Sequence, residues 1–361
     1  GALRNAMVVH AACGGSTNLL IHIPAIAYSA GLPRPTVDDW SEVNRSVPRL
    51  VDVLPNGPEN HPTVRVFLAG GVPEILLHLR RMDLLNLGVL TVTGETLGQT
   101  LDWWEGSARR RRLKVQLRQQ DGVDPNDVIM DPDAARRRGL GGAAAFPVGN
   151  LAPGGSVVKA TAIDSSVIED EVYCHRGPAR VFTSEAAAVA AIKGLTDPPV
   201  REGDVVVIVG LGPRGTGMEE TYQVTSALKF LPWGKSVAVV TDGRFSGVST
   251  GACVGHVSPE ALAGGPLGRL RDGDLVEIRI DRRALEGRVD LVGTAEGPLT
   301  AEEARRFLVS RRPHPDLAPR ADLPADTRLW AVLQEASGGI WAGGVYDPEM
   351  IASALDRSES E

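Results

Sequence analysis

The chain has 361 residues, enough for two domains with separate hydrophobic cores. Hydrophobic residues make up 43% of it and charged residues 23%, as in ordinary globular proteins, and the net charge of −7 argues against a nucleic-acid or anionic-membrane partner. No apolar run reaches the roughly 18 residues of a membrane span and no signal peptide precedes the first motif, so we expect a cytoplasmic protein.

The sequence opens in the middle of a helical pattern. Residues 2–12 have amphipathic spacing, residues 13–18 form a glycine-rich break, and residues 19–30 carry a second apolar pattern. The break offers Ser16, Thr17 and Asn18 as caps for the second helix. A helix N-terminus behind paired glycines is either an anion site or an ordinary capped turn. Because chains rarely begin inside an element, we expect that an N-terminal portion precedes this sequence.

Helices predominate in the first part of the chain. Residues 36–39 resemble a capping box at a helix start, and the Gly-Gly-Val-Pro turn at residues 69–74 predicts another helix. Residues 89–93 are typical of a short strand that ends in a glycine turn. The basic residues 109–114 are typical of a helix face that is exposed to solvent. We therefore predict that residues 1–142 are the C-terminal part of an α/β domain.

From residue 143 the pattern changes to short β-rich runs separated by turns. These runs are residues 156–159, 179–182, 204–209, 236–241, 275–280 and 287–292. Their spacing predicts a β-barrel-like domain with inserted helices, which we place at residues 143–361. The proline-rich segment from residue 311 and the tryptophans after it predict a C-terminal arm that packs on another surface, such as a second subunit.

Two of the predicted strands lead into glycine-rich loops. The loop after Val209 carries Glu219 and Glu220, and the loop after Thr241 carries Ser246. Because the carboxyl ends of neighbouring parallel strands share one crevice, we expect these side chains to face one pocket. The residues alone leave two plainer interpretations open, which are a Gly/Ser turn without chemistry and surface acids in the first turn of a helix.

The loop 210–215 also matches the pattern G-x-G-x-x-G, which favours a nicotinamide-dependent oxidoreductase as an alternative. That fingerprint needs an acidic residue about 20 positions further on, whereas Asp242 comes too late and Pro213 stiffens the turn. No Lys-Ser/Thr pair follows Gly215, so the loop is not a nucleotide P-loop. A single match of this kind gives the dinucleotide interpretation little support.

Five motifs, taken together, resemble one known family. They are GGSTN at residues 14–18, GNLAP at 149–153 with Lys159, GPRGTGMEE at 212–220, DGRFSG at 242–247 and GHVSPEA at 255–261. In this order they resemble the dihydroxy-acid and sugar-acid dehydratases, and the resemblance covers essentially the whole chain. Within the family, the sequence resembles the D-xylonate dehydratase branch more than dihydroxy-acid dehydratase proper. The residues that indicate the branch are 51–57, 221–227 and 323–330.

The resemblance implies a hydro-lyase that removes water from a sugar acid to give the 2-dehydro-3-deoxy acid. The family uses an iron–sulfur cluster as a Lewis acid, with [2Fe–2S] favoured over [4Fe–4S], and Mg²⁺ to hold the substrate. By the same resemblance, Ser246 is the base that takes the C2 proton and Glu220 is a Mg²⁺ ligand. The implied substrate-binding residues are Gly15, Ser16, Thr17, Asn18 and Arg244. We expect Ser246 and Glu220 to meet in one cleft that faces the glycine turn.

The sequence departs from the family at its beginning. The family's cluster cysteines, with an aspartate and a modified lysine that hold Mg²⁺, precede the GGSTN motif, and this sequence starts just ahead of it. The three cysteines, Cys13, Cys174 and Cys253, lack cluster spacing, so we assign no iron–sulfur ligand in this chain and expect small, partly buried thiols.

We therefore expect the chain to be the C-terminal portion of an enzyme, inactive by itself, whose second domain carries the catalytic serine. We expect a small sugar acid as its substrate and a homodimer or homotetramer as its assembly. Two alternatives to a sugar-acid dehydratase stay open. One is a dihydroxy-acid dehydratase of branched-chain amino-acid biosynthesis, and the other is a non-catalytic truncated module.

Overall fold

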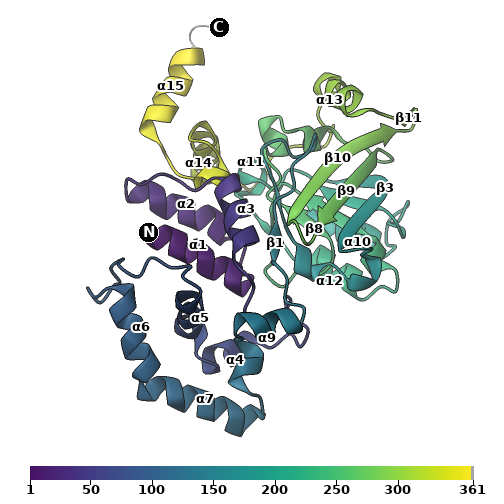
Figure 1. Ribbon diagram of the computed structural model, residues 1–361. Coiled ribbons are helices and arrows are strands. Elements are labelled where there is room, and N and C mark those ends of the chain that lie inside the picture. Colours follow the sequence, from purple (N-terminus) through teal and green to yellow (C-terminus); the bar gives the residue numbers. More distant parts are fainter. Residues whose placement is uncertain (359–361) are drawn as a thin grey trace. The chain divides into compact units, whose positions relative to one another are not determined.

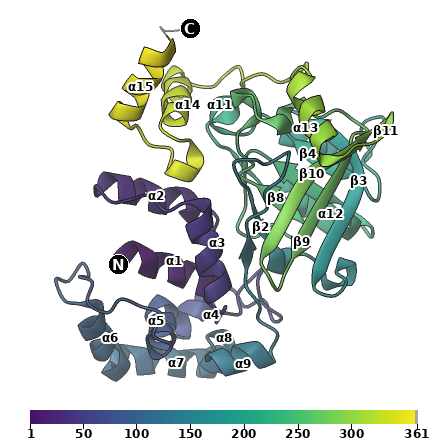
Figure 2. The same ribbon diagram turned by 45° about the horizontal axis from the view of Figure 1, so that its top comes forward.

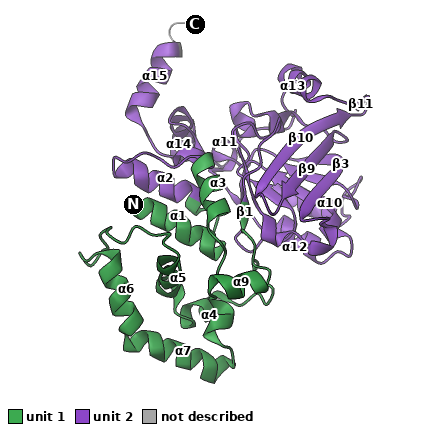
Figure 3. Cartoon of the chain, viewed as in Figure 1, with its two compact units in different colours: residues 1–19, 38–144 green, residues 20–37, 145–361 purple. Residues whose placement is uncertain are grey.

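The computed structural model describes residues 1–358 and divides the chain into two compact units (Figure 3). The first unit holds residues 1–19 and 38–144, and the second holds residues 20–37 and the chain from Ala145 onward. Helices and one large mixed sheet confirm the predicted α/β class. The predicted domain boundary at residues 142 and 143 stays a prediction. Within residues 1–358, no helix is both long enough and apolar enough to cross a bilayer.

The first unit is built mainly from helices, and the predicted helices at its start and after residue 69 are confirmed. Its helices are α1 (Ala2–Cys13), α3 (Val37–Ser46), α4 (Thr63–Leu68), α5 (Gly71–Arg81), α6 (Leu97–Gly106), α7 (Ala108–Asp121), α8 (Pro125–Val128) and α9 (Pro132–Arg137). The expected strand at residues 89–93 is wrong. This segment is a turn closed by a single bridge between Leu90 and Thr96, and the Val92 side chain is fully exposed. With no apolar surface to cover it, the segment cannot gain the burial that stabilises a strand.

The basic segment in α7 is only partly a solvated face, which corrects the expectation from sequence. Glu74 in α5 is 3% exposed and accepts hydrogen bonds from Arg110 Nε at 2.7 Å and Lys114 Nζ at 2.7 Å. Burial by itself would raise the pKa of Glu74, but the bonds from Arg110 and Lys114 outweigh it and lower the pKa to about 2. A buried carboxylate paired in this way joins α5 to α7.

The second unit contains a nine-stranded sheet with the order β1-β2-β8-β6-β4-β3-β9-β10-β11 (Figures 1 and 2). Its strands are β1 (Ala144–Ala145), β2 (Val157–Lys159), β3 (Val172–Phe182), β4 (Val205–Ile208), β6 (Ala238–Thr241), β8 (Cys253–Gly255), β9 (Leu275–Asp281), β10 (Glu286–Thr294) and β11 (Gly297–Pro298). All six runs predicted to be strands lie in this sheet. The strands β3, β4, β6 and β8 are parallel to one another, and antiparallel pairs flank them.

The centre of the sheet is buried on both faces. Every residue of β4 and β6 is buried, as expected for β-branched strands that helices cover. The helix α10 (Glu185–Ile192) packs on β3 and β4 and contacts α12 (Gln223–Lys229). The register pairs Ile208 with Thr241, so these two strands end side by side. Both glycine-rich loops therefore leave the same edge of the sheet, as the sequence predicted.

The curled sheet is tied back on itself by the residues that follow β1. Val148 bridges to Arg288 in β10, and the Val289 N–H donates to the Val148 carbonyl at 3.2 Å. A Cβ on Gly149 would lie 2.2 Å from the Val289 carbonyl oxygen, so only glycine allows this approach. The next side chain, Asn150, then exchanges two hydrogen bonds with the backbone of Leu291, at 2.7 and 3.0 Å. This contact gives the barrel-like curvature that was predicted.

The C-terminal segment packs within the second unit. Its helices are α13 (Ala301–Ser310), α14 (Ala325–Ala336) and α15 (Pro348–Ser358), and α2 (Leu19–Ser29) and α11 (Pro213–Thr216) complete the unit. A Cβ on Gly343 would lie 2.5 Å from the backbone nitrogen of Ala25, and Arg34 pairs with Asp347 at 3.3 Å. The predicted arm therefore lies against α2 and the segment after it.

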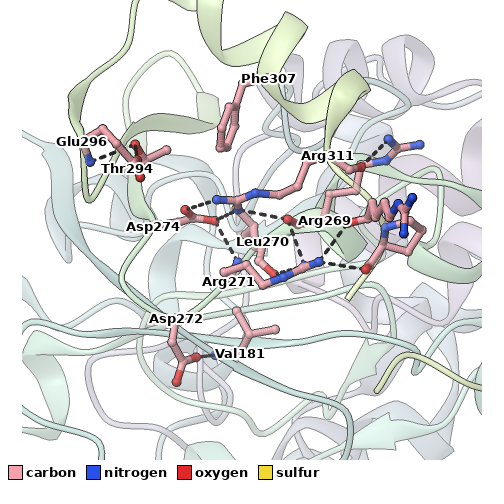
Figure 4. A network of polar contacts seen from close by, with 12 residues as sticks. Val181, Arg269, Leu270, Arg271, Asp272, Asp274, Thr294, Glu296, Phe307 and Arg311 are labelled. Carbon is pink, nitrogen blue, oxygen red and sulfur yellow. Dashed lines mark hydrogen bonds and ion pairs between the residues drawn. The ribbon is translucent and has the colours of Figure 1, made fainter. Parts of the chain in front are cut away.

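Three arginines hold the connection between α13 and this arm (Figure 4). Arg269 Nη1 donates to the carbonyls of Leu308, Val309 and Arg311. Arg271 donates to the carbonyls of Arg312 and Pro313, and Arg311 pairs with the buried carboxylate of Asp274. These charge-assisted bonds satisfy the carbonyls that the end of α13 and the proline-rich segment leave unpaired.

The closure by Asn150 predicts a stability effect. We expect Asn150→Ala to lower the free energy of unfolding by about 2 kcal/mol or more, because it leaves both the N–H and the carbonyl of buried Leu291 unpaired. Urea denaturation measures the change, and Asn126→Ala on the exposed face of α8 is the control. Equal midpoints for the two variants would show that the closure does not stabilise the sheet.

Candidate active site

The two glycine-rich loops are held together by Asp242, which directly follows β6. Its side chain is completely buried and accepts hydrogen bonds from the N–H groups of Gly210 at 3.1 Å, Leu211 at 2.9 Å and Ala261 at 2.9 Å. Burial raises the pKa of Asp242, while these three backbone donors oppose the shift. One carboxylate thus fixes the starts of both loops and the segment that follows β8.

A second buried carboxylate, Glu260, lies beside the first. Both of its oxygens accept the Arg214 N–H at 3.1 Å, where α11 begins. A Cβ on Gly212 would lie 2.3 Å from Glu260 Oε2, which explains a glycine at that position. Burial, followed by repulsion from Asp242, raises the pKa of Glu260 to about 8. At neutral pH this carboxyl is therefore largely protonated.

A short parallel pair of strands brings the predicted site residues together. β5 (Glu220–Thr221) pairs with β7 (Arg244–Phe245), with Glu220 opposite Arg244. The Ser246 N–H donates to the Thr221 carbonyl at 3.0 Å. Glu220 therefore lies in β5, and Ser246 directly follows the neighbouring strand β7. The expectation that Glu219 and Glu220 open a helix is wrong, because α12 begins only at Gln223.

Arg244 lies between the backbone of one loop and the carboxylate of Glu220. Its Nε donates to the Met218 carbonyl at 2.8 Å, and its Nη1 is 4.0 Å from Glu220 Oε2. Met218 has a φ of +70°, which an L-residue adopts only under constraint. Glu220 is about one-third exposed, whereas Glu219 is half exposed and pairs with Arg320 at 3.2 Å. The two adjacent glutamates thus differ in their surroundings.

The loop after β7 is held at several points. The Ser249 N–H donates to the Ser246 carbonyl at 3.0 Å, and the Ser249 hydroxyl accepts from Thr225 Oγ1 at 3.1 Å. Lys159 Nζ donates to the Gly247 carbonyl at 2.9 Å. The Ser246 side chain itself is half-buried. Its backbone is therefore fixed on both sides by hydrogen bonds.

The buried His256 packs behind this loop. Its ring is 6.4 Å from the Phe245 ring and 5.9 Å from the Trp341 ring, and its carbonyl accepts from Trp341 Nε1 at 3.2 Å. Burial, followed by repulsion from Arg244, lowers the pKa of His256 to about 3. The imidazole is therefore neutral at physiological pH and is a weak base.

The predicted substrate-binding turn belongs to the first unit. Gly14 has a φ of +63° and ends α1, and the Ser16 hydroxyl accepts the Asn18 N–H at 3.3 Å. His10 Nε2 lies 3.0 Å from the Ser16 carbonyl oxygen. Thr17 is 2% exposed, and its hydroxyl has no hydrogen-bond partner among the residues that the structure describes. The turn thus keeps one buried polar group for which the described chain offers no partner.

The residues present do not fit an iron–sulfur cluster. Cys174 is exposed, and burial raises the pKa of Cys13 and of Cys253 to about 12, whereas cluster ligands must be thiolates. Nowhere in residues 1–358 do three His, Cys, Asp or Glu side chains gather in a way that could hold a metal ion. The expectation of partly buried thiols fits Cys13 but is wrong for exposed Cys174 and fully buried Cys253.

The loop 210–215 does not suit a dinucleotide. A phosphate in such a loop is bound by free backbone N–H groups at the start of a helix. Here Asp242 takes the N–H groups of Gly210 and Leu211, and Glu260 takes that of Arg214. Two carboxyl groups therefore occupy the positions that a pyrophosphate would need, which removes the support for a nicotinamide-dependent oxidoreductase.

Residues 128–311 match the family model for the dihydroxy-acid/6-phosphogluconate dehydratase C-terminal region, and residues 1–100 match the model for the N-terminal region. The chain belongs to the dihydroxy-acid/6-phosphogluconate dehydratase family. The resemblance seen in the five motifs is thereby confirmed.

Named relatives within this dehydratase family differ in how similar they are to the chain. It is 60% identical to the D-xylonate dehydratase YagF and 58% identical to the D-xylonate dehydratase YjhG, both of Escherichia coli (strain K12). These matches cover 99% and 98% of the chain and 54% of each relative. A dihydroxy-acid dehydratase of Halothermothrix orenii (strain H 168 / OCM 544 / DSM 9562) is 41% identical over 79% of the chain and 46% of that relative. The chain spans about half the length of the curated relatives it matches.

Sequence reasoning did not assign a role to four polar residues that shape the candidate site. They are Lys159, Asp242, His256 and Glu260. All four lie inside or next to the motifs, but their burial follows from how the loops pack together. A carboxylate within a glycine-rich loop could have indicated a buried residue that organises the loop, since Asp and Glu are rarely fully buried unless they are hydrogen-bonded.

The raised pKa of Glu260 predicts how stability depends on pH. A carboxyl whose folded pKa is raised to about 8 stabilises the fold fully below its unfolded value near 4.5, and this contribution is lost as pH rises through about 8. We expect the free energy of unfolding to fall by at least about 1 kcal/mol across this window, and to fall less in Glu260→Gln, which cannot ionise. Urea denaturation at several pH values checks this, with Glu219→Gln as the exposed control. Parallel curves for the wild type and Glu260→Gln would contradict it.

Proposed function

We propose that the whole protein containing this chain is a hydro-lyase that converts a D-xylonate-like sugar acid into its 2-dehydro-3-deoxy acid. The observation that carries the proposal is the pairing of β5 with β7, in which Glu220 lies opposite Arg244 and the Ser246 N–H donates to the Thr221 carbonyl at 3.0 Å. The similarity to the two D-xylonate dehydratases supports the choice of substrate class.

In this proposal Ser246 acts as the base. Its deprotonated Oγ takes the proton from C2 of the substrate, and the C–H electron pair forms the double bond between C2 and C3. The C3–O bond breaks with its electrons moving to the oxygen, and the leaving hydroxide takes the proton from Ser246 Oγ and departs as water, which returns Ser246 to its deprotonated form. The resulting enol becomes the 2-oxo acid by tautomerisation. A serine hydroxyl is a weak acid, so the site has to stabilise its anion.

The proposal assigns substrate binding to Arg244 and to the turn of Gly15, Ser16, Thr17 and Asn18. Arg244 offers a guanidinium for the substrate carboxylate, and its contact with the Met218 carbonyl fixes its direction. Thr17 offers an unpartnered hydroxyl, as described above. The proposed assembly is a homodimer or homotetramer, and the proposed location is the cytoplasm.

An iron–sulfur cluster and Mg²⁺ belong to the proposal because enzymes of this family generally use them. We propose [2Fe–2S] as the cluster type. When bound, such groups supply Lewis-acid stabilisation of substrate oxygens. The described residues offer Glu220 as a single carboxylate ligand for Mg²⁺ and no cluster ligand set, so no reaction step is assigned through either group here.

A second candidate function is that of a dihydroxy-acid dehydratase. The chain is 41% identical to one such enzyme, against 60% to a D-xylonate dehydratase, so this function is less favoured. Turnover of a panel of aldonic acids beside a branched 2,3-dihydroxy acid distinguishes the two functions.

We expect Ser246→Ala to lower kcat for D-xylonate in the whole protein by at least about 100-fold, since a positioned base contributes 10²- to 10⁴-fold. The visible absorption of the cluster should stay unchanged, which shows that the protein is intact. Val248→Ala changes an exposed apolar side chain two residues further along the loop and is the control. Full turnover in Ser246→Ala would exclude this residue as the base.

The two adjacent glutamates allow a matched test of metal binding. We expect Glu220→Gln to raise the Mg²⁺ concentration needed for half-maximal activity by about tenfold or more, since the ion loses a charged oxygen ligand. Glu219→Gln should leave this concentration unchanged, because Glu219 pairs with Arg320 instead. Titration of the metal-free whole protein with Mg²⁺ measures both variants. Equal Mg²⁺ requirements would contradict the assignment of Glu220.

A further inference from the structure

Lys159 is a buried ammonium group next to the serine loop. It ends β2, is 4% exposed, and its Nζ donates to the Gly247 carbonyl at 2.9 Å. No carboxylate forms an ion pair with it among residues 1–358. Burial lowers the pKa of Lys159 to about 8, so most of the protein molecules carry a charged Lys159 at neutral pH.

A buried charge without a counter-ion is costly, and proteins normally pair it or replace it. An ammonium has three N–H donors, and the Gly247 carbonyl is the one acceptor bonded to it among the residues described. A methionine or leucine at this position would fill a similar space without the cost of a buried charge. The charge therefore needs a role other than stabilising the fold.

The position of Lys159 indicates that role. The Gly247 carbonyl belongs to the residue directly after Ser246, and the Ser246 carbonyl is held by the Ser249 N–H at 3.0 Å. The segment after Lys159 also holds the far end of the loop, because the Gly251 N–H donates to the Ala162 carbonyl at 2.8 Å. Lys159 therefore places a positive charge within the short loop that presents the Ser246 hydroxyl.

We propose that Lys159 is a positioning residue whose charge stabilises the anion of Ser246 and whose hydrogen bond fixes the Ser246 loop. This rests on the proposed role of Ser246 as the base. Lys159 keeps its own proton throughout, and the C2 proton still passes to Ser246 Oγ. A fixed cation inside a water-poor site stabilises a developing anion far more than the same charge does in water.

The test uses the whole protein and separates charge from packing. We expect Lys159→Met to lower kcat by about 100-fold, as removal of one preorganised donor does, with KM changed by less than about threefold. The melting temperature should stay the same or rise, because a buried charge has been removed. Lys235→Met removes an exposed lysine of the same unit and is the control for a general charge effect.

Chemical rescue gives a second readout. Lys159→Ala leaves space for a small amine, so we expect propylammonium to restore at least a tenth of the lost kcat, while neutral propanol of similar size restores none. If Lys159→Met does not fold, the comparison of propylammonium with propanol tests the role of the charge by itself. Equal effects of propylammonium and propanol would overturn the role of the charge.

The outcomes also separate this inference from the proposed function. If Ser246→Ala is inactive but Lys159→Met keeps kcat within about threefold of the wild type, the inference about Lys159 is wrong and the proposed function stands. If Ser246→Ala remains active, the proposed function itself fails. Loss of kcat in Lys159→Met without loss of thermal stability supports the inference.

Discussion

The candidate site depends on the hydrogen bonds that Asp242 accepts. Its carboxylate holds three N–H groups from two separate segments, at Gly210, Leu211 and Ala261. Each buried donor left without a partner costs roughly 1–3 kcal/mol, so loss of this side chain would leave three such donors unpaired. The β5–β7 pair is part of the loops that these bonds fix. Asp242, although completely buried, therefore helps to fix the two loops that carry Glu220 and Ser246.

The buried ionisable groups around the two glycine-rich loops are satisfied by backbone groups rather than by one another. Asp242 and Glu260 accept backbone N–H groups, and Lys159 donates to a backbone carbonyl. A direct ion pair would cancel the fields of both partners, whereas backbone dipoles satisfy each group and leave much of its charge in place. Separate satisfaction thus preserves the positive charge of Lys159 beside the loop that carries Ser246. This arrangement suits a loop that has to carry a transient anion.

The sequence was sufficient to predict an element where the local residue pattern agrees with the burial that the fold gives to it. The β-branched runs became β4 and β6 because both faces of these strands are covered, and their neighbouring ends placed the two loops together. The sequence was misleading where contacts between residues far apart in the chain determine the local structure or the exposure of a side chain. Glu220 is in a strand because Arg244 lies opposite it, and Arg110 faces inward because Glu74 is buried nearby. Residues 89–93 have strand-like composition but no surface to cover them. None of these partners can be identified from residues adjacent in the sequence.

If Glu220 holds Mg²⁺ and Arg244 holds the substrate as proposed, the closeness of the two side chains would couple the binding of metal and substrate. Mg²⁺ requires near-octahedral oxygen ligands at about 2.0–2.1 Å, and one glutamate supplies at most a small part of such a shell. Arg244 Nη1 is only 4.0 Å from Glu220 Oε2, so a divalent ion placed at this carboxylate meets a second positive charge. A substrate carboxylate resolves that repulsion, because its two oxygens can face the ion and the guanidinium at once. Each cation then strengthens the binding of the shared anion, and by linkage the sugar acid strengthens the binding of Mg²⁺.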